Sequence, residues 1–238
     1  MKDLITGWKH ACDLAGASWG GGETPTLKGI ITPGTVALGG SAIGFISSPS
    51  RLISDKNIRA GDRILLLRST GINANGLSLA RAIAKKLPNG YATKMNNGQL
   101  YGDGILKKTN IYTKVIQDML NAGIPIHYIS NITGHGFRKL MRGRGRFTYV
   151  IERLFPPQEL FNFIQKHANL TDEDMYDEFN MGMDYAIYLP EQYLKKAQTI
   201  VKKNKFHCID AGHVEKGPRR VVITPKNITF AGDRLDLR

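Results

Sequence analysis

Beyond residue 57, short apolar runs of strand length alternate with segments whose apolar residues recur at helical spacing. The first such run is Arg63–Leu67, and the first helical pattern covers Leu77–Leu87. The same reasoning predicts strands at 126–132, 148–151, 184–189, 206–209 and 219–224, and helices at 111–120, 137–141, 156–167 and 191–203. Alternating strands and helices predict an α/β (α+β) fold with a mixed sheet covered by helices.

The first part of the chain reads differently. Apolar residues at helical spacing lead up to Gly16, and the apolar run Gly40–Ile46 predicts a strand. Residues 47–57 have the composition of a linker. We therefore expect two regions, 1–47 and 58–238, of which the first is too short to bury a core of its own.

Composition narrows the class of protein. Hydrophobic residues make up 42% of the chain and charged residues 22%, which is typical of a globular protein. The chain contains neither a membrane-spanning apolar run nor the apolar core of a signal peptide, so we expect a cytoplasmic protein with no membrane partner. Cys12 and Cys208 are too few and too far apart for a disulfide framework or a CxxC metal site.

A net charge of +13 indicates an anionic partner, which could be nucleic acid, acidic lipid or a phosphorylated small molecule. Five cations cluster within nine residues: Arg138, Lys139, Arg142, Arg144 and Arg146. The RGRGR run resembles an RNA-binding segment, but it has no interleaved aromatic residues, and a surface loop explains it better. Nucleic acid is therefore the least favoured partner.

The segment Ser69–Gly76 joins a predicted strand to a predicted helix. Its glycines would let backbone N–H groups approach a phosphate at the start of the helix. The candidate ligand residues are Ser69, Gly71, Asn75 and Gly76. An ordinary turn between a strand and a helix would need similar residues, and the segment is not a Walker A loop.

A second junction, Asn131–Gly136, precedes the basic cluster. Here the candidates are Thr133, Gly134 and Gly136, with Arg138 or Lys139 available to neutralise an anion. His135 stands between two glycines, where an accessible imidazole could transfer a proton, although an isolated histidine more often merely occupies a turn. The third junction, Phe179–Gly182, indicates only a turn.

The segment Gly20–Thr24 (GGGET) places a carboxylate and a hydroxyl beside flexible backbone. Gly21, Gly22, Glu23 and Thr24 are therefore candidates for nucleotide binding, with Glu23 as a ligand of a hydrated Mg²⁺. The histidines show no zinc-binding spacing.

Taken in order, GGET, STGINANGLSLAR, ILKKTNIY, ISNITGHGFRKLMR and FNMGMDYAIYL resemble the phosphoribosylaminoimidazole synthetase (phosphoribosylformylglycinamidine cyclo-ligase) family of purine biosynthesis. The resemblance extends over nearly the whole chain. It implies an ATP- and Mg²⁺-dependent ligase that closes the imidazole ring of formylglycinamidine ribonucleotide. It also implies a C-terminal-type α/β domain, preceded here by the remnant of an ATP-binding, dimerising first domain.

Several positions depart from the family pattern. Asn73 and Asn131 replace family histidines, Ala37 replaces an aspartate, Lys108 replaces a proline, and His135 replaces a glycine. Most of the first domain has no counterpart in the chain. We therefore expect the chain to need a homodimer partner or a separate N-terminal half for activity. The alternatives are a non-catalytic member that binds a phosphorylated ligand or a partner subunit, and a basic nucleic-acid-binding protein.

Overall fold

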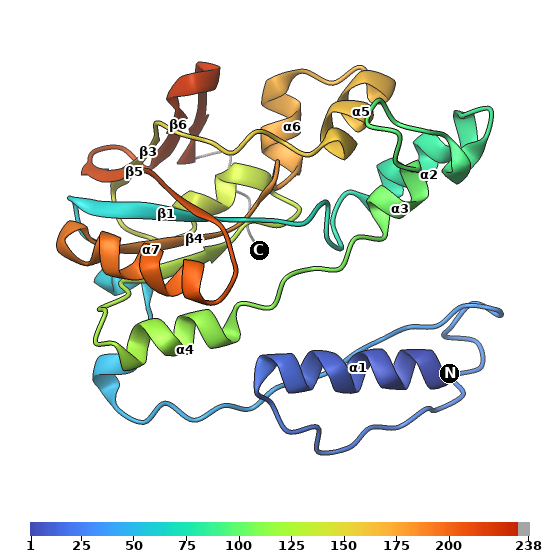
Figure 1. Cartoon of the computed structure of the whole chain (residues 1–238), viewed down its shortest axis with the longest axis horizontal. Helices are drawn as coiled ribbons and strands as arrows, with labels where there is room; N and C mark the ends of the chain where they lie inside the picture. Colours follow the sequence, from blue (N-terminus) through green and yellow to red (C-terminus); the bar gives the residue numbers. More distant parts are fainter. Residues whose placement is uncertain (233–238) are drawn as a thin grey trace. The chain divides into compact units, whose positions relative to one another are not determined.

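The structure is a computed structural model that describes residues 1–232 (Figure 1). It divides into two compact units, Met1–Leu52 and Ile53–Arg238. The division falls within the stretch 47–57 that has linker composition. Each unit is described by itself.

The first unit contains one long helix, α1 (Lys2–Ala15), which ends where Gly16 adopts a left-handed conformation with φ of 67°. No residue of α1 is buried. The strand predicted at Gly40–Ile46 is wrong: this segment has no regular secondary structure. Strands form by pairing, and the described unit offers this apolar run no neighbouring strand. Its large side chains are consequently exposed, Ile43 and Phe45 almost completely.

The second unit is built on a seven-stranded sheet in the order β2-β4-β1-β5-β3-β6-β7. The strands are β1 (Asp62–Arg68), β2 (Tyr128–Asn131), β3 (Phe147–Ile151), β4 (Met183–Pro190), β5 (Cys208–Lys216), β6 (Arg220–Ile223) and β7 (Ile228–Ala231). All neighbours pair antiparallel except β3 and β6, which are parallel. The predicted mixed sheet is thus confirmed, although most of its pairs are antiparallel.

Helices cover both faces of this sheet (Figure 1). One face carries α2 (Leu77–Lys86), α3 (Tyr101–Ile105), α5 (Glu159–Ala168) and α6 (Asp172–Glu178), and the other carries α4 (Thr113–Asn121) and α7 (Leu194–Lys203). Strand β1 lies between both layers: Ile64 and Leu66 face the first layer, while Leu65 and Leu67 face the second. This explains why β1 is a continuous apolar run rather than an alternating one.

A capping box forms at Thr171, at the start of α6, because the Thr171 hydroxyl accepts from the Asp174 N–H and the Asp174 carboxylate accepts from the Thr171 N–H. The predicted helix at 137–141 is instead a short 3₁₀-helix, η4 (Gly136–Met141). No helix of the described residues is long and apolar enough to cross a membrane.

Candidate functional site: three glycine-rich loops

The Ser69–Gly76 loop connects β1 to α2 and is held in place from both ends. The Ser69 N–H donates to the Gly182 carbonyl over 2.9 Å, and the Ser69 hydroxyl donates to the Gly71 carbonyl over 3.1 Å. Gly76 has a φ of 67°, and a Cβ there would lie 2.2 Å from the Phe179 ring. Only glycine satisfies both conditions. No side chain caps the N-terminus of α2 at Gly76, so its first N–H groups have no side-chain acceptor of that kind.

The Phe179–Gly182 turn, which indicated no chemistry in the sequence, braces this loop. Asn180 is buried; its amide nitrogen donates to the Gly71 carbonyl over 3.0 Å. Its side-chain oxygen accepts from the Gly182 N–H, also over 3.0 Å. The turn therefore supports the Ser69–Gly76 loop from beneath.

The Asn131–Gly136 loop follows β2 and lies next to the same loop. A Cβ on Gly134 would lie 3.2 Å from the Asn75 side-chain oxygen, so the Asn75 side chain packs against Gly134. Gly136 has a φ of 47°, and a Cβ on it would meet the Tyr176 carbonyl oxygen at 2.1 Å. Because η4 is a 3₁₀-helix of six residues, the expected anion site at an α-helix start does not exist there. Any ligand contact must come from the loop itself and from nearby side chains.

The two cations proposed for this loop differ in their surroundings. Arg138 forms an ion pair with Asp177, so its charge is already balanced. Lys139 instead contacts the Thr133 hydroxyl, and no carboxylate among residues 1–232 lies within ion-pair distance of its ammonium group. Partial burial and the neighbouring Arg142 lower the pKa of Lys139 below its ordinary value. Lys139 is thus the better candidate for a phosphate contact. His135 is exposed at the start of η4.

The GGGET segment lies in the first unit, where Trp19 donates from its indole nitrogen to the Gly21 carbonyl. Glu23 is exposed. No group of three metal-ligating side chains occurs in the part of the chain that the structure describes. One carboxylate and the Thr24 hydroxyl suit Mg²⁺ only when phosphate oxygens and waters supply its other ligands.

A buried polar network beneath the Ser69–Gly76 loop was not predicted. Asp184, on β4 and almost fully buried, accepts from the Asn73 amide nitrogen over 2.6 Å, and the Tyr112 hydroxyl lies 2.8 Å from its other oxygen. Burial raises the pKa of Asp184 above its ordinary value. Tyr112 and Asn110 also line a surface hollow of about 340 Å³ beside the network. The sequence signal was the single carboxylate directly after the third glycine-rich turn.

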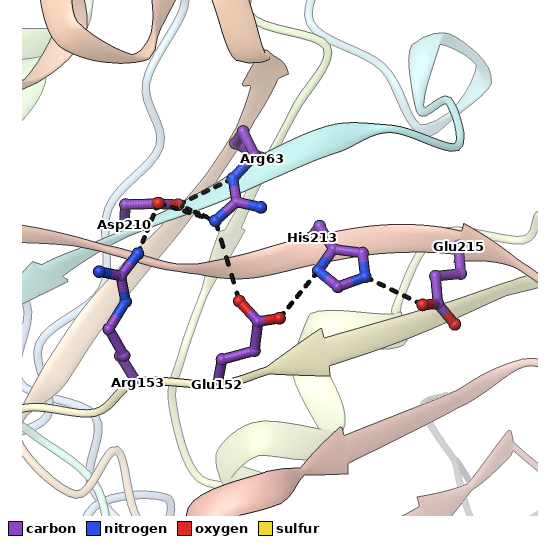
Figure 2. A network of polar contacts seen from close by, with 6 residues as sticks. All are labelled: Arg63, Glu152, Arg153, Asp210, His213 and Glu215. Carbon is purple, nitrogen blue, oxygen red and sulfur yellow. Dashed lines mark hydrogen bonds and ion pairs between the residues drawn. The ribbon is translucent and has the colours of Figure 1, made fainter.

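A second polar network lies on β1, the end of β3, and β5 (Figure 2). Asp210 contacts Arg63 and Arg153, while His213 lies between two carboxylates, at 3.5 Å from Glu152 and 2.9 Å from Glu215. Figure 2 shows these side chains linked in one chain of contacts along neighbouring strands. The contacts join side chains of β1, β5 and the segment after β3, so the network connects neighbouring strands.

The fold and these loops define an α/β domain whose glycine-rich junctions present backbone groups at one end of the central strands. Residues 59–224 match the family model described as "AIR synthase related protein, C-terminal domain", and the chain belongs to this family. The curated relatives are named phosphoribosylformylglycinamidine cyclo-ligase, as the motifs predicted.

Three of these relatives set the scale of the similarity. The protein of Methanocaldococcus jannaschii is 35% identical over 77% of this chain and 52% of its own length. The protein of Clostridium novyi is 31% identical over 93% of this chain and 65% of its own length. The protein of Rippkaea orientalis is 28% identical over 94% of this chain and 66% of its own length. The chain therefore spans between about half and two thirds of the length of these relatives. Among solved structures, the hydrogenase maturation protein HypE shares the fold, with a TM-score of 0.51 at 16% identity over 77% of this chain and 57% of that one.

Proposed function

We propose that the chain takes part in the ATP-dependent cyclisation of formylglycinamidine ribonucleotide to aminoimidazole ribonucleotide, in the cytoplasm. The convergence of the Ser69–Gly76 and Asn131–Gly136 loops carries this proposal. A Cβ on Gly134 would lie 3.2 Å from the Asn75 side-chain oxygen, so the two loops lie side by side, and no side-chain cap occupies the start of α2 at Gly76. Such an arrangement suits a phosphorylated ligand.

The residues have distinct proposed roles. Gly71, Asn75, Gly76 and the first N–H groups of α2 bind one phosphoryl group, and Thr133, Gly134, Gly136 and Lys139 bind another. Ser69 holds the first loop through its bond to Gly71, and Arg138 braces the second through Asp177. His135 moves a proton, because an exposed imidazole can reach a ligand at this loop. The reaction needs positioning and charge stabilisation more than covalent chemistry from the protein.

Residues 1–47 are, in this proposal, the end of a first α/β domain. Gly21, Gly22, Glu23 and Thr24 contribute to the nucleotide site there. Mg²⁺, held by Glu23 together with phosphate oxygens, would neutralise charge on the transferring phosphoryl group. The exposed apolar run that includes Val36, Ile43 and Phe45 needs a covering strand, which the remaining part of the first domain supplies.

The proposal is tested by assaying ATP-dependent ring closure with the purified chain alone and after adding the N-terminal region of a full-length relative. We expect turnover only in the mixture. Turnover by the 238 residues alone would show that no further segment is needed. Tight nucleotide binding without turnover in either sample would favour a second candidate, a non-catalytic ligand-binding member. One observation favours that candidate: Asn73, at a position where the family pattern has histidine, is engaged with Asp184.

A further inference from the structure

Asp184 is the buried titratable group that lies closest to the proposed phosphate loop without a role in it. It sits at the start of β4, with its side chain between the Ser69–Gly76 loop and the segment before α4. No Lys, Arg or His among residues 1–232 forms an ion pair with it. The side chains that face it are neutral: Asn73 from the loop, Tyr112 before α4, and Tyr185 next to it on β4. The Arg68 guanidinium lies over the Phe155 ring instead.

The number of hydrogens available to the contacts of this network indicates whether Asp184 is protonated. The Tyr112 oxygen lies 2.8 Å from Asp184 Oδ2 and 2.7 Å from the Arg68 carbonyl oxygen, and Tyr112 has one hydrogen to donate. If Asp184 is ionised, one of these two contacts joins two oxygens with no hydrogen between them. If Asp184 is protonated, it donates to Tyr112, and Tyr112 donates to the Arg68 carbonyl. Only the neutral acid places a hydrogen in both of these Tyr112 contacts.

Asn110 fits the same arrangement. Its amide nitrogen lies 2.8 Å from the Tyr112 oxygen and 3.2 Å from the Arg68 carbonyl oxygen. A tyrosine oxygen has two acceptor sites, so it can accept from Asn110 and from protonated Asp184 together. Asp184, Tyr112, Asn110 and the Arg68 carbonyl then each have a partner that matches them.

One hydrogen bond, from Asn73 to Asp184, connects this network to the Ser69–Gly76 loop. Asn73 has a φ of 59°, a left-handed conformation that asparagine tolerates better than most residues. Its side-chain oxygen is buried without a hydrogen-bond partner among the described residues, so the bond to Asp184 is the one that orients its side chain. Loss of this bond would free the middle of the loop.

We propose that Asp184, as the neutral acid, is a positioning residue that holds Asn73 and thereby keeps the Ser69–Gly76 loop in its phosphate-binding conformation. The part of this inference that concerns phosphate rests on the proposed function; the part that concerns the loop does not. Loop order and ligand affinity therefore decrease as pH rises and Asp184 loses its proton.

The first experiment uses the full chain without ligand. Carboxyl ¹³C NMR follows the titration of Asp184, and amide hydrogen exchange gives protection factors for residues 71–76 in the wild type, Asp184→Asn, Asp184→Leu and Asn73→Ala. Asparagine imitates the neutral acid, since it can accept from Asn73 and donate to Tyr112. We expect the pKa of Asp184 to lie above its ordinary value, because the side chain is buried. Asp184→Asn should keep the loop protected at every pH, whereas Asp184→Leu and Asn73→Ala should lose protection.

The matched control is Asp62→Asn, which changes another buried aspartate on the neighbouring strand β1, where it contacts His127. This variant should leave residues 71–76 unchanged. Titration of Asp184 in the ordinary range, or equal loop protection in all variants, would overturn the inference. If Asp184→Leu does not fold, Asn73→Ala and Asp184→Asn still decide it.

The second experiment measures ATP binding to the same proteins by calorimetry at several pH values. Wild-type affinity should fall as pH rises, the Asp184→Asn affinity should stay flat, and Asn73→Ala should bind about tenfold more weakly, as expected for one lost buried hydrogen bond. Flat wild-type affinity would contradict the link between Asp184 and the ligand. If the wild type binds no phosphorylated ligand, the proposed function fails, while the NMR and exchange results still decide the positioning role.

Discussion

Arg63 and Asp210, 147 residues apart in the chain, form a two-pronged ion pair across the neighbouring strands β1 and β5. Arg63 Nη2 lies 2.7 Å from both carboxylate oxygens, and its Nε lies 3.0 Å from one of them. Both side chains are mostly buried, at 18% and 16% exposed. The bond to Asp210 raises the pKa of Arg63 above its already high value. This pair joins the first strand of the sheet to one of its last.

Replacing Arg63 by methionine should therefore lower the free energy of unfolding by about 2 kcal/mol, because Asp210 would stay behind with only the more exposed Arg153. Chemical denaturation monitored by circular dichroism measures this change. Lys226→Ala, which removes the more exposed contact with Asp172, is the control and should cost less. Equal losses in the free energy of unfolding in both variants would mean that the geometry of the Arg63–Asp210 pair adds nothing to stability.

Gly136→Ala should destabilise the protein by about 3 kcal/mol, because it combines a strained positive φ with a Cβ placed 2.1 Å from the Tyr176 carbonyl oxygen. Gly123→Ala is the matched control: its φ is also positive, at 75°, but no atom lies within 4 Å of the added Cβ. It should cost about 1 kcal/mol. Thermal melts of both variants give the comparison, and similar melting temperatures would refute the close contact.

Lys139→Ala should weaken the binding of ATP or of the ribonucleotide by about tenfold or more, because it removes a charged donor near the Asn131–Gly136 loop. Arg138→Ala should mainly reduce stability, since Arg138 is paired with Asp177. Lys166→Ala, an exposed change on α5, controls for net charge. Calorimetric titration at constant salt separates the three. A larger effect of Arg138→Ala on affinity would reverse the assignment.

His135→Gln should reduce turnover by about 100-fold or more in the complete assembly, as expected when a general acid or base is lost. Ligand binding should change little, because glutamine keeps the size and polarity of the side chain. The kcat and the dissociation constant are measured side by side. An unchanged kcat would return His135 to the role of a plain turn residue.

Asp184 also makes a prediction about stability. Its pKa is raised on folding by burial, so the native state binds more protons than the unfolded state at pH values between the ordinary and the native pKa. The free energy of unfolding should therefore fall as pH rises through this window. The Asp184→Asn variant has no titrating group at this position, so its free energy of unfolding does not contain this pH-dependent contribution. Its stability relative to the wild type should therefore increase with pH. Denaturation curves at several pH values test this, and a constant difference would contradict it.

The core of the fold was predictable because its signals are local. The apolar run at Arg63–Leu67 lies inside β1, and the helical period at Leu77–Leu87 extends one residue beyond α2. The prediction errors arise where the formation of a strand depends on pairing with another strand. Gly40–Ile46 has strand composition but no partner strand among the described residues of its unit, and β7 (Ile228–Ala231) was not predicted.

The candidate site shows the same division. The glycine-rich loops were visible in the sequence because positive φ values and close approaches demand glycine, as at Gly76 and Gly136. The partners of the charged groups were not visible. Arg138 and Lys139 are adjacent in the sequence, yet only Arg138 meets a carboxylate, and Asp184 lies 111 residues from the Asn73 that it holds. Such contacts depend on the tertiary fold.

The place of β1 in the sheet has a consequence for synthesis. The ribosome makes β1 early, but its neighbours are β4 (Met183–Pro190) and β5 (Cys208–Lys216). The nascent chain must therefore carry an unpaired, strongly apolar segment until most of the protein has been made. Such segments invite aggregation and chaperone binding, and late closure around them slows folding. A ribosome that stalls before Cys208 would release a chain whose central strand still lacks one of its two partners.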